Sequence, residues 1–94
     1  MNEDDFDWSE RKAAENMRKH KVSFEVARHV FDDPDALDEI DDSEHYGEDR
    51  YNIIGMIRGR LFFVTYTMRG TRYRLISARG AEPHEKKRYR EENR

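Results

Sequence analysis

The chain has 94 residues, of which 41% are charged and 35% hydrophobic, so we expect one small domain that spans residues 1–94. It contains no cysteine, which excludes a disulfide framework and a cysteine-based zinc site and fits a reducing compartment. The longest apolar run, residues 61–64, is far shorter than the roughly 20 residues of a membrane-spanning helix. We therefore expect a cytoplasmic protein without a membrane partner.

The net charge of −3 hides a strong asymmetry along the chain. Residues 1–49 hold 6 Lys/Arg and 17 Asp/Glu (−11), whereas residues 50–94 hold 12 Lys/Arg and 4 Asp/Glu (+8). This distribution predicts a positive face and a negative segment, as in a protein that binds phosphate and whose own acidic residues screen part of its positive charge. The alternative is a mixed-charge surface that serves only solubility.

Residues 5–34 predict a short strand and two helices. Polar and aromatic side chains alternate over residues 5–8, which is typical of a strand. Ser9 is a predicted N-cap for a helix that reaches about Lys19, and Ser23 caps a second helix that Asp33-Pro34 ends. The large apolar side chains of this part are expected in the core: Trp8, Met17, Phe24 and Phe31.

Residues 32–49 carry ten acidic residues and no Lys or Arg, and we expect a loop or a weak edge strand there. Three runs rich in β-branched and aromatic residues follow, over residues 50–57, 61–68 and 72–78. Short glycine-centred separators predict that these runs form an antiparallel meander, with the second run at the sheet centre. In the third run, alternation predicts two faces, one with Tyr73, Leu75 and Ser77 and one with Arg72, Arg74, Ile76 and Ala78.

Glu82-Pro83 opens a final helix, which we expect to fray over residues 90–94. The predicted fold class is α+β, in which N-terminal helices pack on an antiparallel β-meander sheet and a C-terminal helix follows.

The sequence contains none of the common nucleotide-binding, serine hydrolase or metalloprotease motifs. The four histidines have no metal-ligand spacing, and the acidic run 38–42 lacks the spacing of a calcium loop. We therefore expect neither a metal nor a cofactor.

The remaining chemical signal is a set of arginines interleaved with aromatic residues. Guanidinium groups bind phosphate through two parallel hydrogen bonds, and exposed aromatic rings can stack on RNA bases. Arg69 and Arg79 each end a strand, where we expect side chains to converge around a groove. Outward arginines that only keep a sheet edge soluble are the alternative. The arginines are Arg50, Arg58, Arg60, Arg69, Arg72, Arg74 and Arg79, and the aromatic residues are Tyr51, Phe62, Tyr66 and Tyr73.

Six fragments resemble the BrnT toxins in order and spacing, over about Phe6 to Tyr89. They are Asn16-x-x-Lys19-His20-x-Val22-Ser23-Phe24, Val30-Phe31-x-Asp33, Tyr46-Gly47-Glu48-x-Arg50, Gly59-Arg60-Leu61, Val64-x-Tyr66-Thr67-x-Arg69-Gly70 and Ile76-Ser77-Ala78-Arg79-x-Ala81. The resemblance implies a RelE-like fold, a ribonuclease that blocks translation, and neutralisation by a BrnA antitoxin with a ribbon-helix-helix domain. Gly80 departs from the pattern, because a second basic residue is common there.

Metal-free RNA cleavage needs a base for the 2′-hydroxyl proton, cations for the phosphorane and an acid for the leaving oxygen. The predicted proton carriers are Glu48, His45 and Tyr66, and the predicted phosphate clamps are Arg50, Arg69 and Arg79. Further RNA contacts are predicted for Arg60, Arg72, Arg74, Lys86 and Lys87. Glu48 and Arg50 could equally form a structural ion pair, and His20 suits a helix end as well as a catalytic role.

The expected partners are an RNA substrate and a BrnA-like antitoxin in a 2:2 complex that represses its own operon. Operator DNA would be contacted only through the antitoxin, which would dock on the sheet and the last helix of the toxin. The alternative function is a non-catalytic nucleic-acid-binding or co-repressor module.

Overall fold

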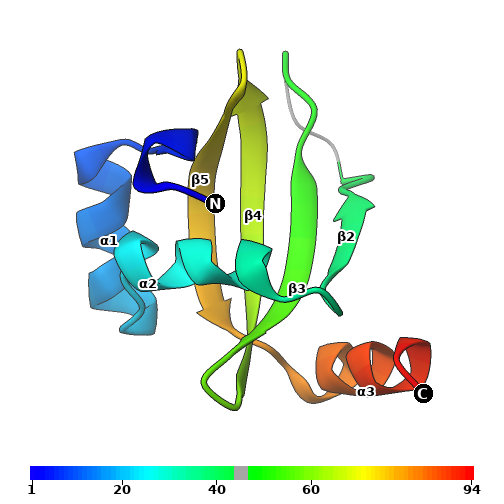
Figure 1. Ribbon diagram of the computed structural model, residues 1–94. Helices are drawn as coiled ribbons and strands as arrows, with labels where there is room; N and C mark the ends of the chain where they lie inside the picture. The colour runs from blue at the N-terminus through cyan, green and yellow to red at the C-terminus, as the bar shows by residue number, and fades with distance from the viewer. Residues whose placement is uncertain (44–46) are drawn as a thin grey trace.

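A computed structural model describes residues 1–43 and 47–94 (Figure 1). Its elements are η1 (Glu3–Asp5), β1 (Phe6–Asp7), α1 (Glu10–His20), α2 (Phe24–Ala27), η2 (Arg28–Asp32), β2 (Leu37–Ile40), β3 (Tyr51–Ile57), β4 (Arg60–Arg69), β5 (Arg72–Gly80) and α3 (Pro83–Glu92), where η denotes a 3₁₀-helix. The predicted α+β class is confirmed, with helices first, then the meander, then a helix.

The sheet has five strands in the order β1-β5-β4-β3-β2. The predicted meander β3-β4-β5 is antiparallel, with β4 in the centre, and the acidic segment supplies the edge strand β2. The sheet as a whole is mixed, because β1 pairs with β5 in parallel, a pairing that the sequence analysis left open. That pairing joins residues 67 positions apart, Phe6 with Tyr73, so the local pattern of residues 5–8 could not specify it.

Both predicted serine caps are present. Ser9 Oγ accepts the N–H of Lys12 at 3.3 Å, and Ser23 Oγ accepts the N–H of Val26 at 3.1 Å. The second predicted helix has the expected extent but changes type, because it is α-helical only to Ala27 and then tightens into η2. Gly55 of β3 allows η2 to approach closely, since a Cβ at that position would lie 2.9 Å from the Cβ of Val30.

Side chains from the two faces of the sheet enter different cores. On one face, α1, α2 and η2 cover the larger core, whose fully buried members include Phe24, Val30, Val64 and Leu75. We call this the helix face. The other face carries a small core under α3, formed by Ile54, Leu61 and Tyr89. We call this the α3 face. Figure 1 shows α2 and η2 across the sheet, α1 beside β5 and α3 at the lower end of the strands.

A register shift between Thr65 and Tyr66 breaks the alternation that the sequence predicts for β5. Thr65 is opposite Ser77 and Tyr66 is opposite Leu75, so Ile76 is an extra residue in this strand. Leu75 and Ala78 are three positions apart, and both belong to the core of the helix face. The predicted face of Ala78 is therefore wrong.

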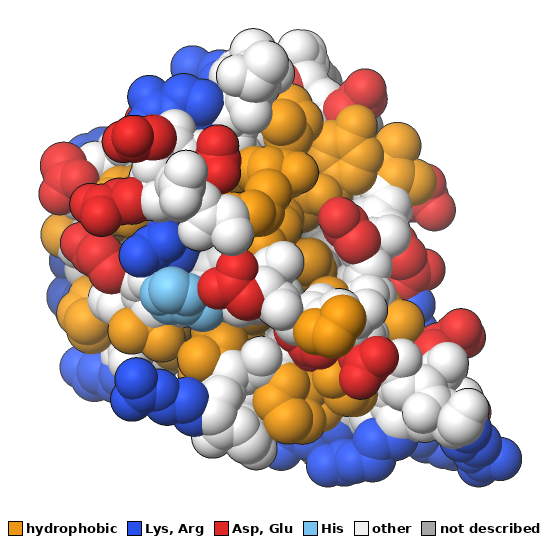
Figure 2. All heavy atoms as spheres, viewed as in Figure 1, with side chains coloured by type: hydrophobic (Ala, Val, Ile, Leu, Met, Phe, Trp, Pro, Cys, Tyr) orange, Lys and Arg blue, Asp and Glu red, His pale blue; other side chains and the backbone are white. Residues whose placement is uncertain are grey.

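Five aromatic rings form a cluster on the helix face, and Phe6 is the member that contacts both Phe31 and Tyr73. The ring centroids of Phe31 and Tyr73 are 4.7 Å apart, and those of Tyr51 and Tyr66 are 5.3 Å apart. Tyr66 and Tyr73 join the two pairs at 5.4 Å. The surface near the upper parts of β3 and β4 is accordingly hydrophobic (Figure 2).

The C-terminal helix is longer than predicted. It continues through Glu92, and the side chain of Asn93 donates hydrogen bonds to the carbonyls of Tyr89 and Asp35. Asp33 also holds α3, because its carboxylate accepts the hydroxyl of Tyr89 at 2.8 Å and the N–H of Met56 at 2.8 Å. Fraying from residue 90 is therefore not observed.

Candidate active site

Arg74 and the tyrosines next to it in the sheet, Tyr66 and Tyr73, do not form one exposed surface. Tyr66 and Tyr73 belong to the core of the helix face. Arg74 is opposite Thr67, the neighbour of Tyr66, and its guanidinium binds Asp7. Because side chains of a strand alternate between faces, neighbouring Arg and Tyr residues cannot share one surface. Tyr66 is therefore buried and not available for base stacking beside Arg74, and the RNA contacts of the other residues stay a prediction.

Arg69 and Arg79 do not converge around one groove. Arg69 pairs with Arg72 at the β4–β5 turn, whereas Arg79 pairs with Phe63 toward the other end of the sheet. The separation along β4 between residues 63 and 69 corresponds to roughly 20 Å. Both residues end a strand, but β4 and β5 are antiparallel, so their final residues lie at opposite ends of the sheet.

Arg79 forms a two-pronged ion pair with Glu85 of α3. The two N–O distances are 2.8 and 2.9 Å, and the guanidinium lies over the ring of Phe63. Glu85 is buried and also accepts the N–H of Glu82 at 2.7 Å, which closes a capping box. Burial alone would raise the pKa of Glu85, but these hydrogen bonds outweigh it and lower the pKa. Arg79 thus anchors α3 to β5.

Three other predicted arginines contact groups of the chain itself. Arg74 pairs with Asp7 at 2.7 Å, and Arg72 donates to the carbonyl of Asp4 at 3.1 Å. Arg50 lies 3.5 Å from Glu48, so the ion pair that the sequence left open is present. Both side chains are about one third exposed and precede β3 rather than lying in it. His45, a predicted proton carrier, lies outside the described residues.

The hydroxyl group of Tyr66 donates a hydrogen bond to the carboxylate of Asp38 in β2, and both carboxylate oxygens lie 2.8 Å from it. Burial, followed by this contact with Asp38, raises the pKa of Tyr66 far above its usual value. Burial also raises the pKa of Asp38, against the effect of the tyrosine hydrogen bond. Tyr66 therefore keeps its proton and joins β4 to the edge strand.

The other predicted RNA contacts differ in how accessible they are. Arg60 is exposed, and its guanidinium lies 4.6 Å from the ring centre of Phe62. Lys87 pairs with Glu91 at 3.7 Å. Arg69 and Lys86 form no ion pair with any residue in the ranges 1–43 and 47–94, so both remain available to an external anion.

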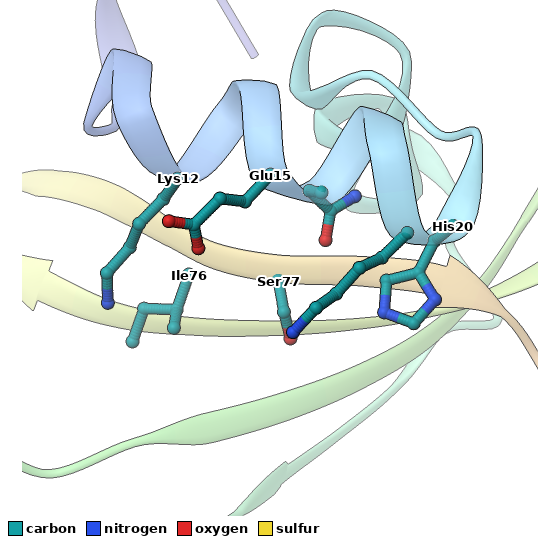
Figure 3. Close-up of a pocket in the computed structure, with 7 residues that line it drawn as sticks. Lys12, Glu15, His20, Ile76 and Ser77 are labelled. Carbon is teal, nitrogen blue, oxygen red and sulfur yellow. The ribbon is translucent and has the colours of Figure 1, made fainter.

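A basic pocket that the sequence analysis did not single out lies between α1 and β5 (Figure 3). One wall consists of five residues of α1, and Ile76 and Ser77 of β5 form the other wall; the α1 residues are Lys12, Glu15, Asn16, Lys19 and His20. Its volume is about 160 Å³. Figure 3 shows Lys12 and His20 extending past the strand that carries Ser77.

The pocket contains basic side chains without carboxylate partners. Lys12, Lys19 and His20 form no ion pair with any part of the chain that the structure describes, whereas Glu15 pairs with Arg11 at 2.8 Å. Since the carboxylate in the pocket is already paired, the local charge is positive. An imidazole and two ammonium groups around an open cavity can bind a phosphate and move a proton.

Asn16 fixes the geometry of this pocket. It is 5% exposed, and its Nδ2 donates to the carbonyls of Ala78 at 2.8 Å and Val22 at 2.9 Å. Its Oδ1 accepts the N–H of Ala78 at 3.0 Å. The amide therefore replaces a neighbouring strand at this edge of β5 and holds α1 against Ser77.

A signal for the pocket was present in the sequence. Positions 12, 16, 19 and 20 lie on one side of an α-helix, because they are separated by four, seven and eight residues. The contribution of β5 has no such signal, since Ser77 is 57 positions beyond His20.

One group of side chains has the composition of a metal site. The ligand atoms of Glu82, His84 and Glu85 lie within 4.8 Å of one another. Glu85 is held in its ion pair with Arg79, which opposes a further cation at that carboxylate.

The family model of BrnT, the ribonuclease toxin of type II toxin–antitoxin systems, matches residues 8–85. The chain belongs to the BrnT family. It is thus a ribonuclease toxin of a type II system, in which a protein antitoxin is the partner. The match includes the whole of α1 and β5 and ends at Glu85, so both walls of the pocket belong to the family domain. No curated protein matches this BrnT chain. Within the described ranges, no helix is long and apolar enough to cross a membrane.

Proposed function

We propose that this BrnT-family ribonuclease cleaves RNA in the pocket between α1 and β5, by acid–base chemistry that needs no metal. The observation that carries the proposal is the unpaired state of Lys12, Lys19 and His20 around an open cavity. The sheet arginines offer no comparable site, because Arg50, Arg74 and Arg79 bind carboxylates of the chain itself.

The reaction forms a bond between the 2′-oxygen and the adjacent phosphorus and breaks the bond from phosphorus to the 5′-oxygen. A base removes the 2′-hydroxyl proton, and an acid returns a proton to the leaving 5′-oxygen, so the products are a 2′,3′-cyclic phosphate and a 5′-hydroxyl. His20 is the proposed proton carrier, and Glu15 is the second group on the same helix face that can accept a proton. Lys12 and Lys19 stabilise the charge that develops on the phosphate oxygens.

Cations outside the pocket would hold the flanking RNA backbone. Arg69, Arg60 and Lys86 are accessible and are proposed as phosphate contacts. Phosphate contacts of this kind position RNA without reading its sequence.

The proposed partner is a BrnA-like ribbon-helix-helix antitoxin that forms a 2:2 complex in the cytoplasm and represses their common operon. The type II family supports a protein antitoxin. Because a ribbon-helix-helix domain dimerises, the repressing complex should contain two toxins. Operator DNA would then be contacted by the antitoxin, since the acidic segment 32–49 of the toxin repels phosphate.

Cleavage assays on purified protein test the catalytic proposal. In EDTA, the wild type should produce 2′,3′-cyclic phosphate ends, and His20→Ala and Lys19→Ala should each lower the cleavage rate by about a hundredfold. His84→Ala, which removes an exposed histidine of α3, is the matched control and should leave the rate unchanged. Thermal unfolding should be the same for all these variants, because the side chains are exposed or open to the pocket.

Two outcomes would contradict this assignment. Loss of cleavage in EDTA with recovery in magnesium would show metal-dependent chemistry. Full activity of His20→Ala together with inactivity of Glu48→Gln would move the catalytic centre to the segment before β3.

The alternative is a toxin that binds RNA without cutting it or acts only as a co-repressor. Induced expression separates the two functions, because a catalyst stops protein synthesis at low copy number. Growth arrest that His20→Ala abolishes would support the enzyme, whereas arrest by both proteins at equal expression would support a binder.

A further inference from the structure

Two neighbouring cavities flank α2 on the surface below η2. They have volumes of about 620 and 230 Å³, and Val26 lines both of them. We call the combined surface the α2 groove, and its main residues are Met17, Lys21, Val26, Arg28, Arg58 and Arg60. The groove is on a different side of α1 from the basic pocket, which Met17 and Lys21 do not line.

The floor of the groove is apolar and accessible. Val26 is 47% exposed, and Met17, which the sequence pattern predicts for the core, is 45% exposed. Ile57 and Phe62 lie at its base. Figure 2 shows hydrophobic side chains over α2 with Lys and Arg side chains gathered below them. Exposed apolar residues bounded by polar ones are typical of a binding surface.

Its rim is cationic. Lys21, Arg28, Arg58 and Arg60 form no ion pair with any described residue. Two acids, Glu25 and Asp32, also line the groove. Asp32 is held by the N-terminal amine and by His29, at 3.2 and 2.9 Å. The surface therefore carries an excess of unpaired positive charge around an apolar floor.

Two of these cations occupy backbone positions that suit glycine. Lys21 has φ 60° and Arg58 has φ 48°, and they are the non-glycine residues with positive φ in the described ranges. Lys21 follows α1 at its C-terminus, where glycine is favoured, and Arg58 precedes Gly59 in a two-residue turn, where asparagine or glycine is favoured. The backbone conformation therefore favours glycine or asparagine over a basic residue at both positions.

We infer that the α2 groove binds an acidic amphipathic segment of the antitoxin, with apolar side chains on Val26 and Met17 and carboxylates facing Lys21, Arg28 and Arg58. This inference rests on the proposed antitoxin partnership and names its surface on the toxin. A protein segment fits better than RNA, because the exposed floor residues are Val26 and Met17, whereas Phe62 is 5% exposed and covered by Arg60, which leaves little aromatic surface for base stacking. An antitoxin segment bound at Lys21 would lie beside the last turn of α1, which carries Lys19 and His20. It would thus block RNA access to the proposed catalytic pocket and inhibit cleavage.

Substitutions at Lys21 and Arg58 can test this inference, because they remove a positive charge and also relieve the strain of a positive φ. Lys21→Gly and Arg58→Asn should each weaken binding to the product of the adjacent gene by about tenfold, measured by calorimetry, because each loses a contact with a carboxylate. Both variants should unfold at the same temperature as the wild type or higher, and both should cleave RNA at the wild-type rate. Val26→Asp should weaken binding further, since it places a carboxylate on the apolar floor.

Lys86→Ala and Lys87→Ala are the matched controls, because they remove the same charge from α3. Their antitoxin affinity should equal that of the wild type. Unchanged affinity of all three groove variants, or loss of affinity only in the α3 variants, would overturn the inference and leave the partnership intact. Loss of RNA cleavage with unchanged antitoxin affinity would identify the groove as an RNA surface. Failure of the wild type to bind would overturn the partnership and this inference with it.

Discussion

The cations of the sheet and the cations of the α1 pocket differ in what surrounds them. Arg74 and Arg79 lie on strands and bind Asp7 and Glu85, which come from other elements. Lys19 and His20 lie on a helix face and have no carboxylate partner among the described residues. Arg74 and Arg79, which the sequence analysis favoured for RNA contacts, are thus used to join elements, whereas Lys19 remains available.

This difference shows that residue type alone does not identify a site in a highly charged chain. A guanidinium binds a carboxylate of its own protein as well as it binds a phosphate. What distinguishes the pocket is that Lys12, Lys19 and His20 have no carboxylate partner among the described residues, since the acid that lines it, Glu15, pairs with Arg11. Substitutions at Asn16, Arg79 and Glu85 therefore separate residues that hold the structure from residues that act on RNA.

Asn16→Ala should lower the free energy of unfolding by about 3 kcal/mol, because it leaves buried backbone groups without partners. Three hydrogen bonds to the Asn16 amide are lost. Two of them involve the N–H and the carbonyl of Ala78, a fully buried residue, and one involves the carbonyl of Val22. Urea denaturation gives the value. Lys19→Ala, from the next turn of α1, is the control and should lose activity without losing stability. Equal stability of both variants would show that Asn16 does not hold α1.

Arg79→Ala should lower the free energy of unfolding by about 2 kcal/mol, because it leaves the buried carboxylate of Glu85 unpaired. Arg74→Ala breaks a pair whose side chains are 25% and 32% exposed, and its loss should stay below about 1 kcal/mol. Replacing Glu85 with Gln in the Arg79→Ala background should recover part of the stability. A large loss of RNA cleavage with unchanged stability would instead support Arg79 as the phosphate clamp that the sequence predicts.

Acidification should loosen α3 from the sheet. Burial acts to raise the pKa of both Glu85 and Asp33, but their hydrogen bonds outweigh it, so both pKa values lie below the ordinary 4.5 and 3.8. The unfolded chain therefore binds protons first, and the stabilisation present at neutral pH is lost as the pH falls through and below those values. Unfolding curves between pH 7 and pH 3 measure this loss.

Glu85→Gln separates the contribution of the ion pair from the rest of the acid response. Its unfolding free energy should depend less steeply on pH below 4.5 than that of the wild type. Asp38 acts in the opposite direction, because burial raises its pKa and its protonation favours the folded state. A variant slope equal to that of the wild type would show that Glu85 is not the group being titrated.

Local sequence determined most of the elements of this protein, because the interactions that specify them join near neighbours. Ser9 and Ser23 cap helices through N–H groups three residues away, and the glycine-centred turns connect adjacent strands. The run at residues 61–68 is apolar at successive positions, so it could only be the central strand between two cores. The BrnT fragments likewise depend only on the order of residues along the chain.

Tertiary structure decided the parallel pairing of β1, the extra residue Ile76 in β5, and the partner of every cation in the candidate site. These features join residues far apart in the chain, such as Asn16 with Ala78 and Phe6 with Tyr73. Sequence placed Lys19 and His20 on the surface of a helix, but only the packing of α1 on β5 placed them opposite Ser77. The sequence likewise predicted that Arg79 is free to bind phosphate. The packing of α3 against the sheet places Glu85 beside Arg79. Whether a charged side chain is free or paired therefore depends on which residues the fold brings next to it.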